Sequence, residues 1–211
     1  MVPIKYLDFG VIVMLCTFEK EYRELVVPYA PPVGSNRRII IPEAKLEKIK
    51  GLAKQIAEAK QGEKHHLIDG KKEYKRQLTG LLGEAAIEEF FGIEVIDFSV
   101  GNSNTYNVAD MKKAGFNLGV KTVEMWKFPI VHKKPRHPEL ICVKRQENEV
   151  VFFGYASKSV LRKFQTDDFV LDKRLRARGT KSAFYGFSEL QEVDTLDDLI
   201  YIYNKLDQRK R

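Results

Sequence analysis

The sequence predicts a single domain of mixed helices and strands, of the α/β or α+β class. Its 211 residues suit one domain, or a compact domain with appended elements. Hydrophobic residues make up 44% of the chain and aromatic residues 11%, which is enough for a buried core. Two stretches with apolar residues at helical spacing precede a series of short apolar runs that are typical of strands.

The first half of the chain is predicted to be mainly helical. Residues 9–16 form a short apolar run that indicates a buried strand, and Arg38–Ile41 is a second strand-like run. Apolar spacing predicts helices from about Glu43 to Lys60 and from about Lys71 to Phe91. Gly92 is expected to end the second helix.

Short strands are predicted for the second half. They are Glu94–Phe98, a strand that begins at Asp110-Met111 and turns at Ala114-Gly115, Asn117–Met125, and the paired strands Leu140–Arg145 and Glu149–Tyr155. A final helix is expected over about Leu196–Leu206.

Composition narrows the class of partner. The net charge of +7 favours a polyanion such as a nucleic acid. The two cysteines, Cys16 and Cys142, are far apart, which argues against a zinc site or a disulfide framework. No apolar stretch has transmembrane length, and the N-terminus does not read as a signal peptide. We therefore expect a soluble cytoplasmic protein, of a bacterial, archaeal or phage-infected cell, without a membrane partner.

Three charged residues stand out because they fall in apolar surroundings. Glu84 lies in the second predicted helix, and its neighbours along that helix are mostly apolar. A buried carboxylate needs a cation or a metal nearby, and the alternative is an ordinary surface glutamate. Lys121 lies in the middle of an apolar strand, with a solvated edge lysine as its alternative. Asp110 is expected to face Lys121 across a bent hairpin.

Together these residue types suit phosphodiester hydrolysis. Carboxylates hold a divalent metal, which polarises the phosphate and activates a water molecule. A nearby cation stabilises the developing charge. Glu84 and Asp110 supply the carboxylates, and Lys121 supplies the cation. The expected cofactor is Mg²⁺ or Mn²⁺.

The same segments resemble the PD-(D/E)XK nuclease superfamily, in particular its phage, restriction and resolvase-type members. The resemblance covers about residues 72–160 and rests on the helical segment Leu81–Gly92 with its Gly-Glu pair, on Val108-Ala-Asp110, and on Leu118-Gly-Val-Lys-Thr122. It implies a restriction-endonuclease-like α/β core, with a mixed central sheet flanked by helices. Residues 1–70 would then be an N-terminal extension that packs on a nuclease core of residues 71–211.

The resemblance also implies a set of site residues. Glu84, Asp110 and Lys121 would be catalytic, and Glu84, Asp110 and the backbone carbonyl of Val120 would bind the metal. The family's usual acidic residue, two positions before the lysine, is Gly119 here, so one carboxylate is missing. Glu84 is the expected replacement. Glu124 is its rival, but strand alternation places Glu124 on the face opposite to Lys121 unless a β-bulge intervenes.

Two basic segments are candidates for contacts with DNA phosphates, with a solvated surface as the alternative. They contribute Lys133, Lys134, Arg136, Lys173, Arg174, Arg176 and Arg178. The expected activity is that of a metal-dependent endodeoxyribonuclease of restriction, phage or repair type. Two alternatives stay open: a nuclease fold that binds nucleic acid without catalysis, and a structural or partner-binding role in which the basic charge is incidental. The sequence also leaves open whether the protein forms a homodimer.

Overall fold

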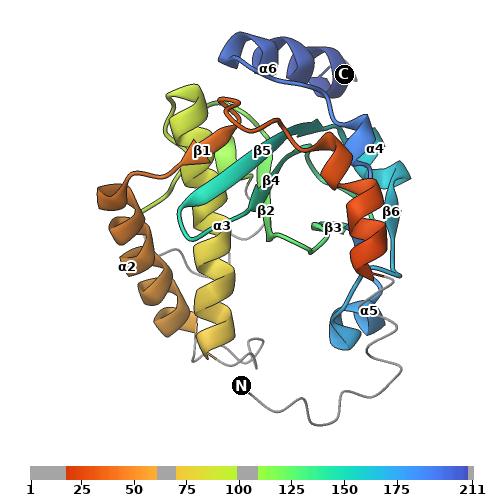
Figure 1. Ribbon diagram of the computed structural model, residues 1–211, viewed down its shortest axis with the longest axis horizontal. Helices are drawn as coiled ribbons and strands as arrows, with labels where there is room; N and C mark the ends of the chain where they lie inside the picture. The colour runs from red at the N-terminus through yellow and green to blue at the C-terminus, as the bar shows by residue number, and fades with distance from the viewer. Residues whose placement is uncertain (1–17, 61–69, 99–108, 209–211) are drawn as a thin grey trace.

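A computed structural model describes residues 18–60, 70–98 and 109–208, and the strand predicted at residues 9–16 lies outside them (Figure 1). A four-stranded sheet with the order β1-β5-β4-β2 forms its centre. The strands are β1 (Arg38–Ile40), β2 (Gly119–Glu124), β4 (Glu139–Lys144) and β5 (Glu149–Ala156). β4 runs parallel to β2 and antiparallel to β5, which in turn is antiparallel to β1. The fold is therefore mixed α/β, with a mixed central sheet.

Two long helices, α2 (Glu43–Lys60) and α3 (Gly70–Phe91), cover one face of this sheet (Figure 1). Their apolar stripes pack together with the sheet residues Val120, Leu140 and Phe152 in one buried cluster. Burial of such stripes is the main source of helix stability in a folded protein. β1 and α2 lie in the segment expected as an N-terminal extension, and both are built into the central sheet and its core.

A second, smaller sheet lies on the other face of the central sheet. It has the order β3-β7-β6, with β3 (Ile130–His132), β6 (Gln165–Thr166) and β7 (Lys181–Phe184). A helical stretch at residues 18–25 packs there too, and a second apolar cluster fills the space between the layers. The short helices α4 (Lys158–Lys163) and α5 (Lys173–Arg178) complete this side (Figure 1).

The chain ends in α6 (Leu196–Tyr203), which continues as a π-helical turn over Asn204–Gln208. Thr195 and Asp198 form a capping box at the start of α6. The Tyr203 hydroxyl accepts a hydrogen bond from the Asn117 backbone N–H, with 3.1 Å between nitrogen and oxygen, and so attaches α6 to the segment before β2. Short 3₁₀ turns cover Val27–Tyr29, Asp110–Lys112 and Phe187–Glu189. Within the described ranges, no helix has the length and apolarity needed to cross a lipid bilayer.

The structure confirms the predicted helices at residues 43–60 and 71–91. It also confirms the pair of strands predicted at Leu140–Arg145 and Glu149–Tyr155, which correspond to β4 and β5. The prediction of a strand at Glu94–Phe98 is wrong, because the backbone N–H groups of Val95 and Ile96 donate to the Glu88 carboxylate. These bonds replace the ladder that a strand would need.

The prediction of a strand at Asp110-Met111 is also wrong, because this segment is the 3₁₀ turn η3 (Asp110–Lys112). The Phe116 N–H bonds to the Met111 carbonyl, and the Met111 N–H bonds to the Leu118 carbonyl. The chain therefore folds tightly back onto the start of β2, without forming a hairpin strand.

Gly83 determines how closely α3 approaches β2. A β-carbon at Gly83 would overlap with the Thr122 hydroxyl, whereas one at Gly80, a turn earlier, would meet no atom within 4 Å. A close approach of this kind requires glycine. The contact brings the next residue of α3, Glu84, to the edge strand β2.

Candidate active site

Asp110 is bonded to the edge of β2. Its Oδ2 accepts a hydrogen bond from the Val120 backbone N–H, with 2.6 Å between nitrogen and oxygen. The neighbouring Gly119 N–H bonds to the Pro138 carbonyl on the side of β4. Because successive residues of a strand point their main-chain groups to opposite sides, the Val120 carbonyl lies on the Asp110 side. No other strand of the described residues pairs with this edge of β2.

Glu84 brings a second carboxylate to this edge from α3. Its side chain is half-buried, and burial raises the pKa of Glu84 well above its ordinary value. The negative charge of Asp110 raises the pKa of Glu84 further, while the positive charge of Lys121 opposes the shift. Among the described residues, none forms a hydrogen bond or a close ion pair with Glu84. Two like charges near each other in a partly buried place favour binding of a cation.

Lys121 approaches the same edge from the other face of the sheet. The contact of Thr122 with α3 shows that Val120 and Thr122 point toward the helices, so Lys121 points away from them. Lys121 nevertheless interacts electrostatically with Glu84, because β2 is an edge strand. Among the described residues, Lys121 has no hydrogen-bond or close ion-pair partner. Asp110 is therefore bonded to the edge of β2 and Glu84 comes to it from α3, whereas Lys121 points to the opposite face of the sheet, against the prediction that all three side chains share one face, and is connected to Glu84 only by its electrostatic influence.

Glu139 is an acidic residue of this region that the sequence did not single out. It begins β4 directly beside Gly119 in the parallel pairing, and only 8% of its surface is exposed. Burial raises the pKa of Glu139, and the positive charges of Lys121 and His137 oppose this rise. Because Lys121 and Glu139 influence each other, Glu139 belongs to the same electrostatic environment as the predicted site. No sequence pattern reveals this proximity, because it depends on which strands pair.

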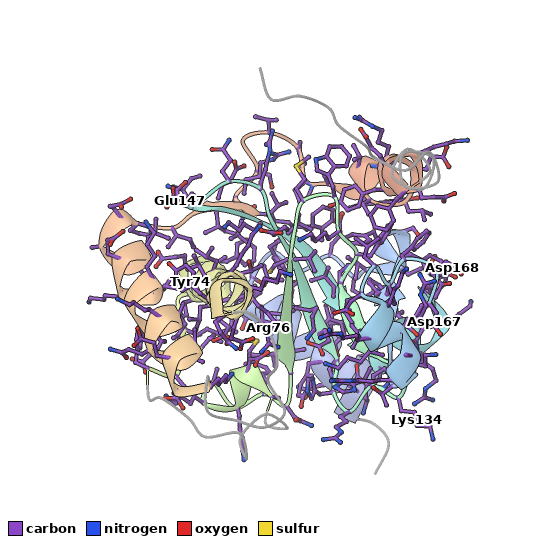
Figure 2. All side chains as sticks on the ribbon, turned by 90° about the horizontal axis from the view of Figure 1, so that it is seen from below. Tyr74, Arg76, Lys134, Glu147, Asp167 and Asp168 are labelled. Carbon is purple, nitrogen blue, oxygen red and sulfur yellow. The ribbon has the colours of Figure 1, made fainter. Side chains whose placement is uncertain are left out.

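Lys181, on β7, is a basic residue that the sequence also missed. It is half-buried, and burial lowers the pKa of Lys181. The nearby positive charges of Lys121, Arg76 and Arg178 lower it further, and Glu139 acts in the opposite direction. Arg76 projects from α3 (Figure 2). Positive charge therefore comes to the surroundings of Lys181 both from α3, on one side of the central sheet, and from the small sheet on the other side.

Glu124, the rival for the missing carboxylate, has partners of its own. Its Oε1 lies 2.7 Å from Nζ of Lys75, and its Oε2 is bonded to Lys127. Burial and these bonds act in opposite directions, and the net effect is that the pKa of Glu124 is lowered. A carboxylate held by two lysines is already neutralised, which disfavours a role as a metal ligand.

The basic segments divide into paired and exposed residues. Lys133 Nζ lies 2.6 Å from Asp167 Oδ2, and Arg176 donates to the carbonyls of Asp168 and Val170 at 3.1 and 2.9 Å. Figure 2 shows Lys134, Asp167 and Asp168 on the side of the sheet away from α3. Arg176 is exposed in spite of these bonds, and so are Lys134, Arg136, Lys173, Arg174 and Arg178. Lys133 and Arg176 therefore stabilise the local structure, whereas Lys134, Lys173, Arg174 and Arg178 present their charge to solvent.

The donors at the edge of β2 fit a hard divalent cation. They are oxygen atoms: the carboxylates of Asp110 and Glu84, and the Val120 carbonyl. Within the described part of the chain, no three His, Cys, Asp or Glu side chains form a ready-made ligand group. Mg²⁺ commonly keeps several waters and binds proteins through one or two carboxylates, so carboxylate and carbonyl oxygens are the donor types that it uses. Like-charged, partly buried carboxylates are the feature that such an ion would neutralise.

No protein-family model, curated protein or solved structure matches this chain. Its function is therefore inferred from the chemistry of the residues around β2.

Proposed function

We propose that the protein is a divalent-metal-dependent endodeoxyribonuclease, and that its mixed α/β fold is restriction-endonuclease-like. The observation that carries the proposal is the half-buried Glu84, whose pKa is raised by burial and by the charge of Asp110, together with the bond of Asp110 to the edge of β2. A pair of carboxylates with a nearby unpaired lysine is the combination that metal-assisted phosphodiester hydrolysis needs. The net charge of +7 suits DNA as the substrate.

The proposed roles follow from the contacts of each residue. Asp110, oriented by the Val120 N–H, and Glu84 would hold Mg²⁺ or Mn²⁺ together with the Val120 carbonyl. When bound, such an ion polarises the scissile phosphate and lowers the pKa of a water molecule. Lys121 would donate a hydrogen bond to the attacking water or to a phosphate oxygen. The exposed basic residues would bind phosphates along the duplex.

Incubation with supercoiled plasmid tests this proposal. Purified protein should convert the plasmid to nicked or linear forms in the presence of Mg²⁺ or Mn²⁺, and EDTA should abolish the conversion. The Lys121→Met variant, purified in the same way, should leave the plasmid intact, because it lacks the proposed cation. Absence of cleavage by the wild-type protein with either metal, on single- or double-stranded DNA, would contradict the proposal.

A second candidate is a nucleic-acid-binding module that has lost catalysis. It is favoured by Gly119 in place of an acidic residue and by the absence of a ready-made group of three metal-binding side chains among the described residues. This protein would bind DNA with a strong dependence on salt but would not cleave it with any divalent metal. The plasmid assay and a binding titration on the same DNA separate the two candidates.

A further inference from the structure

We propose that Lys181 and His132, on the small sheet, form with Lys121 of β2 a binding site for a phosphate group, on the face of the central sheet away from α3. His132 and Lys181 are direct partners in the antiparallel pairing of β3 with β7, so their side chains project from the same face of the small sheet. Lys121 points toward the small sheet, because Val120 and Thr122 point toward the helices. Where the phosphate belongs to DNA, the inference rests on the proposed function.

The positive charge of this cluster is not neutralised within the described part of the chain. Lys121 and the half-buried Lys181 have neither a hydrogen-bond partner nor a close ion-pair partner there. Lys133, the neighbour of His132, provides the contrast, because its Nζ lies 2.6 Å from Asp167 Oδ2. Positive side chains that converge without partners repel one another, and a bound anion removes this repulsion.

The pKa values of the cluster reflect the convergence of its charges. Burial lowers the pKa of Lys181. The charges of Lys121, Arg76 and Arg178 lower it further. Burial also lowers the pKa of His132, and the charges of Lys181 and Lys121 add to that shift. These side chains come from five elements, β2, β3, β7, α3 and α5. A phosphate suits this arrangement, because its oxygens accept several charge-assisted hydrogen bonds at once.

Glu139 is the acidic residue that opposes these charges at Lys181. Its negative charge is partly suppressed, because burial raises the pKa of Glu139. A single carboxylate of this kind faces the positive charges of both Lys121 and Lys181, so the cluster keeps a net positive charge. His132 and Arg178 are exposed, and an anion can therefore reach the cluster from solvent.

Thermal unfolding of the full-length protein, in phosphate and in chloride at equal ionic strength, tests the site with inorganic phosphate as the probe. Phosphate should raise the unfolding midpoint of the wild type by about 2–4 °C once its concentration exceeds the Kd severalfold. Lys181→Met should lose this increase. In chloride its midpoint should equal or exceed that of the wild type, because the substitution removes a half-buried charge that its neighbours repel.

Lys144→Met is the matched control for this measurement. Lys144, the last residue of β4, is also half-buried, but it acts on Glu147 and is not part of the cluster. The control variant should keep the full increase of the midpoint in phosphate. An equal loss of the increase in both variants, or no increase in the wild type, would overturn the inference.

A titration of duplex DNA in EDTA identifies the source of the phosphate. If the site binds the DNA backbone, Lys181→Met should reduce the log–log slope of binding against salt by about 0.9 for one lost contact, and Lys144→Met should not. An unchanged slope, in a variant that has lost the response to inorganic phosphate, would assign the site to free phosphate.

The outcomes separate this inference from the proposed function. Wild-type protein that cleaves DNA but gains no stability from phosphate, with an unchanged salt slope in Lys181→Met, would overturn the phosphate site and leave the nuclease proposal standing. Stabilisation by phosphate that depends on Lys181, in a protein that neither binds nor cleaves DNA, would support the site and contradict the nuclease proposal.

Discussion

Asp110 Oδ2 lies 2.6 Å from the backbone nitrogen of Val120, so the acidic residue of a 3₁₀ turn is bonded to the strand residue directly before Lys121. This bond uses the free edge of β2 instead of another strand. It holds one carboxylate beside a main-chain carbonyl at an edge that α3 reaches from one face and Lys121 from the other. The proposed chemistry depends on this edge remaining open.

The two rival glutamates should respond differently to loss of charge. Glu84→Gln should lower the rate of Mg²⁺-dependent DNA cleavage by orders of magnitude with the fold intact, because it removes a proposed metal ligand. Glu124→Gln should keep most of the activity, because Glu124 is held by Lys75 and Lys127. Cleavage rates and circular dichroism of both variants check this. A larger loss in Glu124→Gln than in Glu84→Gln would show that the metal site is assigned wrongly.

Metal-free protein should lose stability as the pH rises, because burial and the charge of Asp110 raise the pKa of Glu84 well above its ordinary value of 4.5. The folded state then holds this proton more tightly than the unfolded state. The stability is fully present below pH 4.5 and is lost as the pH rises through the raised pKa.

Urea unfolding in EDTA at a series of pH values measures this effect. The wild-type free energy of unfolding should fall more steeply above pH 4.5 than that of Glu84→Gln, and Mn²⁺ at neutral pH should restore stability to the wild type only. Parallel pH profiles of the two proteins would contradict the burial of an uncompensated carboxyl group at residue 84.

DNA binding should depend on the exposed basic residues more than on the paired ones. Lys134→Gln and Arg174→Gln should each weaken binding and flatten its dependence on salt by about 0.9 units of log–log slope per lost phosphate contact. Lys48→Gln, an exposed lysine on α2, serves as the control and should leave the slope unchanged. Fluorescence anisotropy of a labelled duplex between low and moderate salt gives the slopes. Binding that is insensitive to salt would rule out the electrostatic interface.

Gly83 and Gly80 offer a matched test of how α3 sits on β2. Gly83→Ala should destabilise the protein by about 1–3 kcal/mol, the usual cost of overpacking, because its methyl group would overlap with Thr122. Gly80→Ala has open space and should stabilise the helix by roughly 0.5–1 kcal/mol. Chemical denaturation of both variants provides the comparison, and equal effects would contradict the close helix–strand contact.

The sequence predicted the long helices well, because their apolar residues repeat with the helical period over several turns. It failed at Glu94–Phe98, where the Glu88 side chain takes the N–H groups that a strand would use. Asp110, Glu84 and Lys121 were singled out because of their apolar surroundings and their family-like order, and their role as site residues stays a prediction. The position of Glu139 near Lys121 could not be predicted, because it depends on the parallel pairing of Glu139 with Gly119. This pairing joins two separate strands, and no local sequence pattern encodes it.

The single-turnover rate of cleavage of an end-labelled duplex by the wild-type protein and by Asp110→Asn tests the central claim most directly. The amide of this variant would keep an oxygen to accept the Val120 N–H but would lose the charge needed to hold a divalent ion. We predict Mg²⁺-dependent cleavage by the wild type and a rate at least about a hundredfold lower for the variant. Equal rates in the two proteins, purified in parallel, would contradict a metal-dependent centre at Asp110.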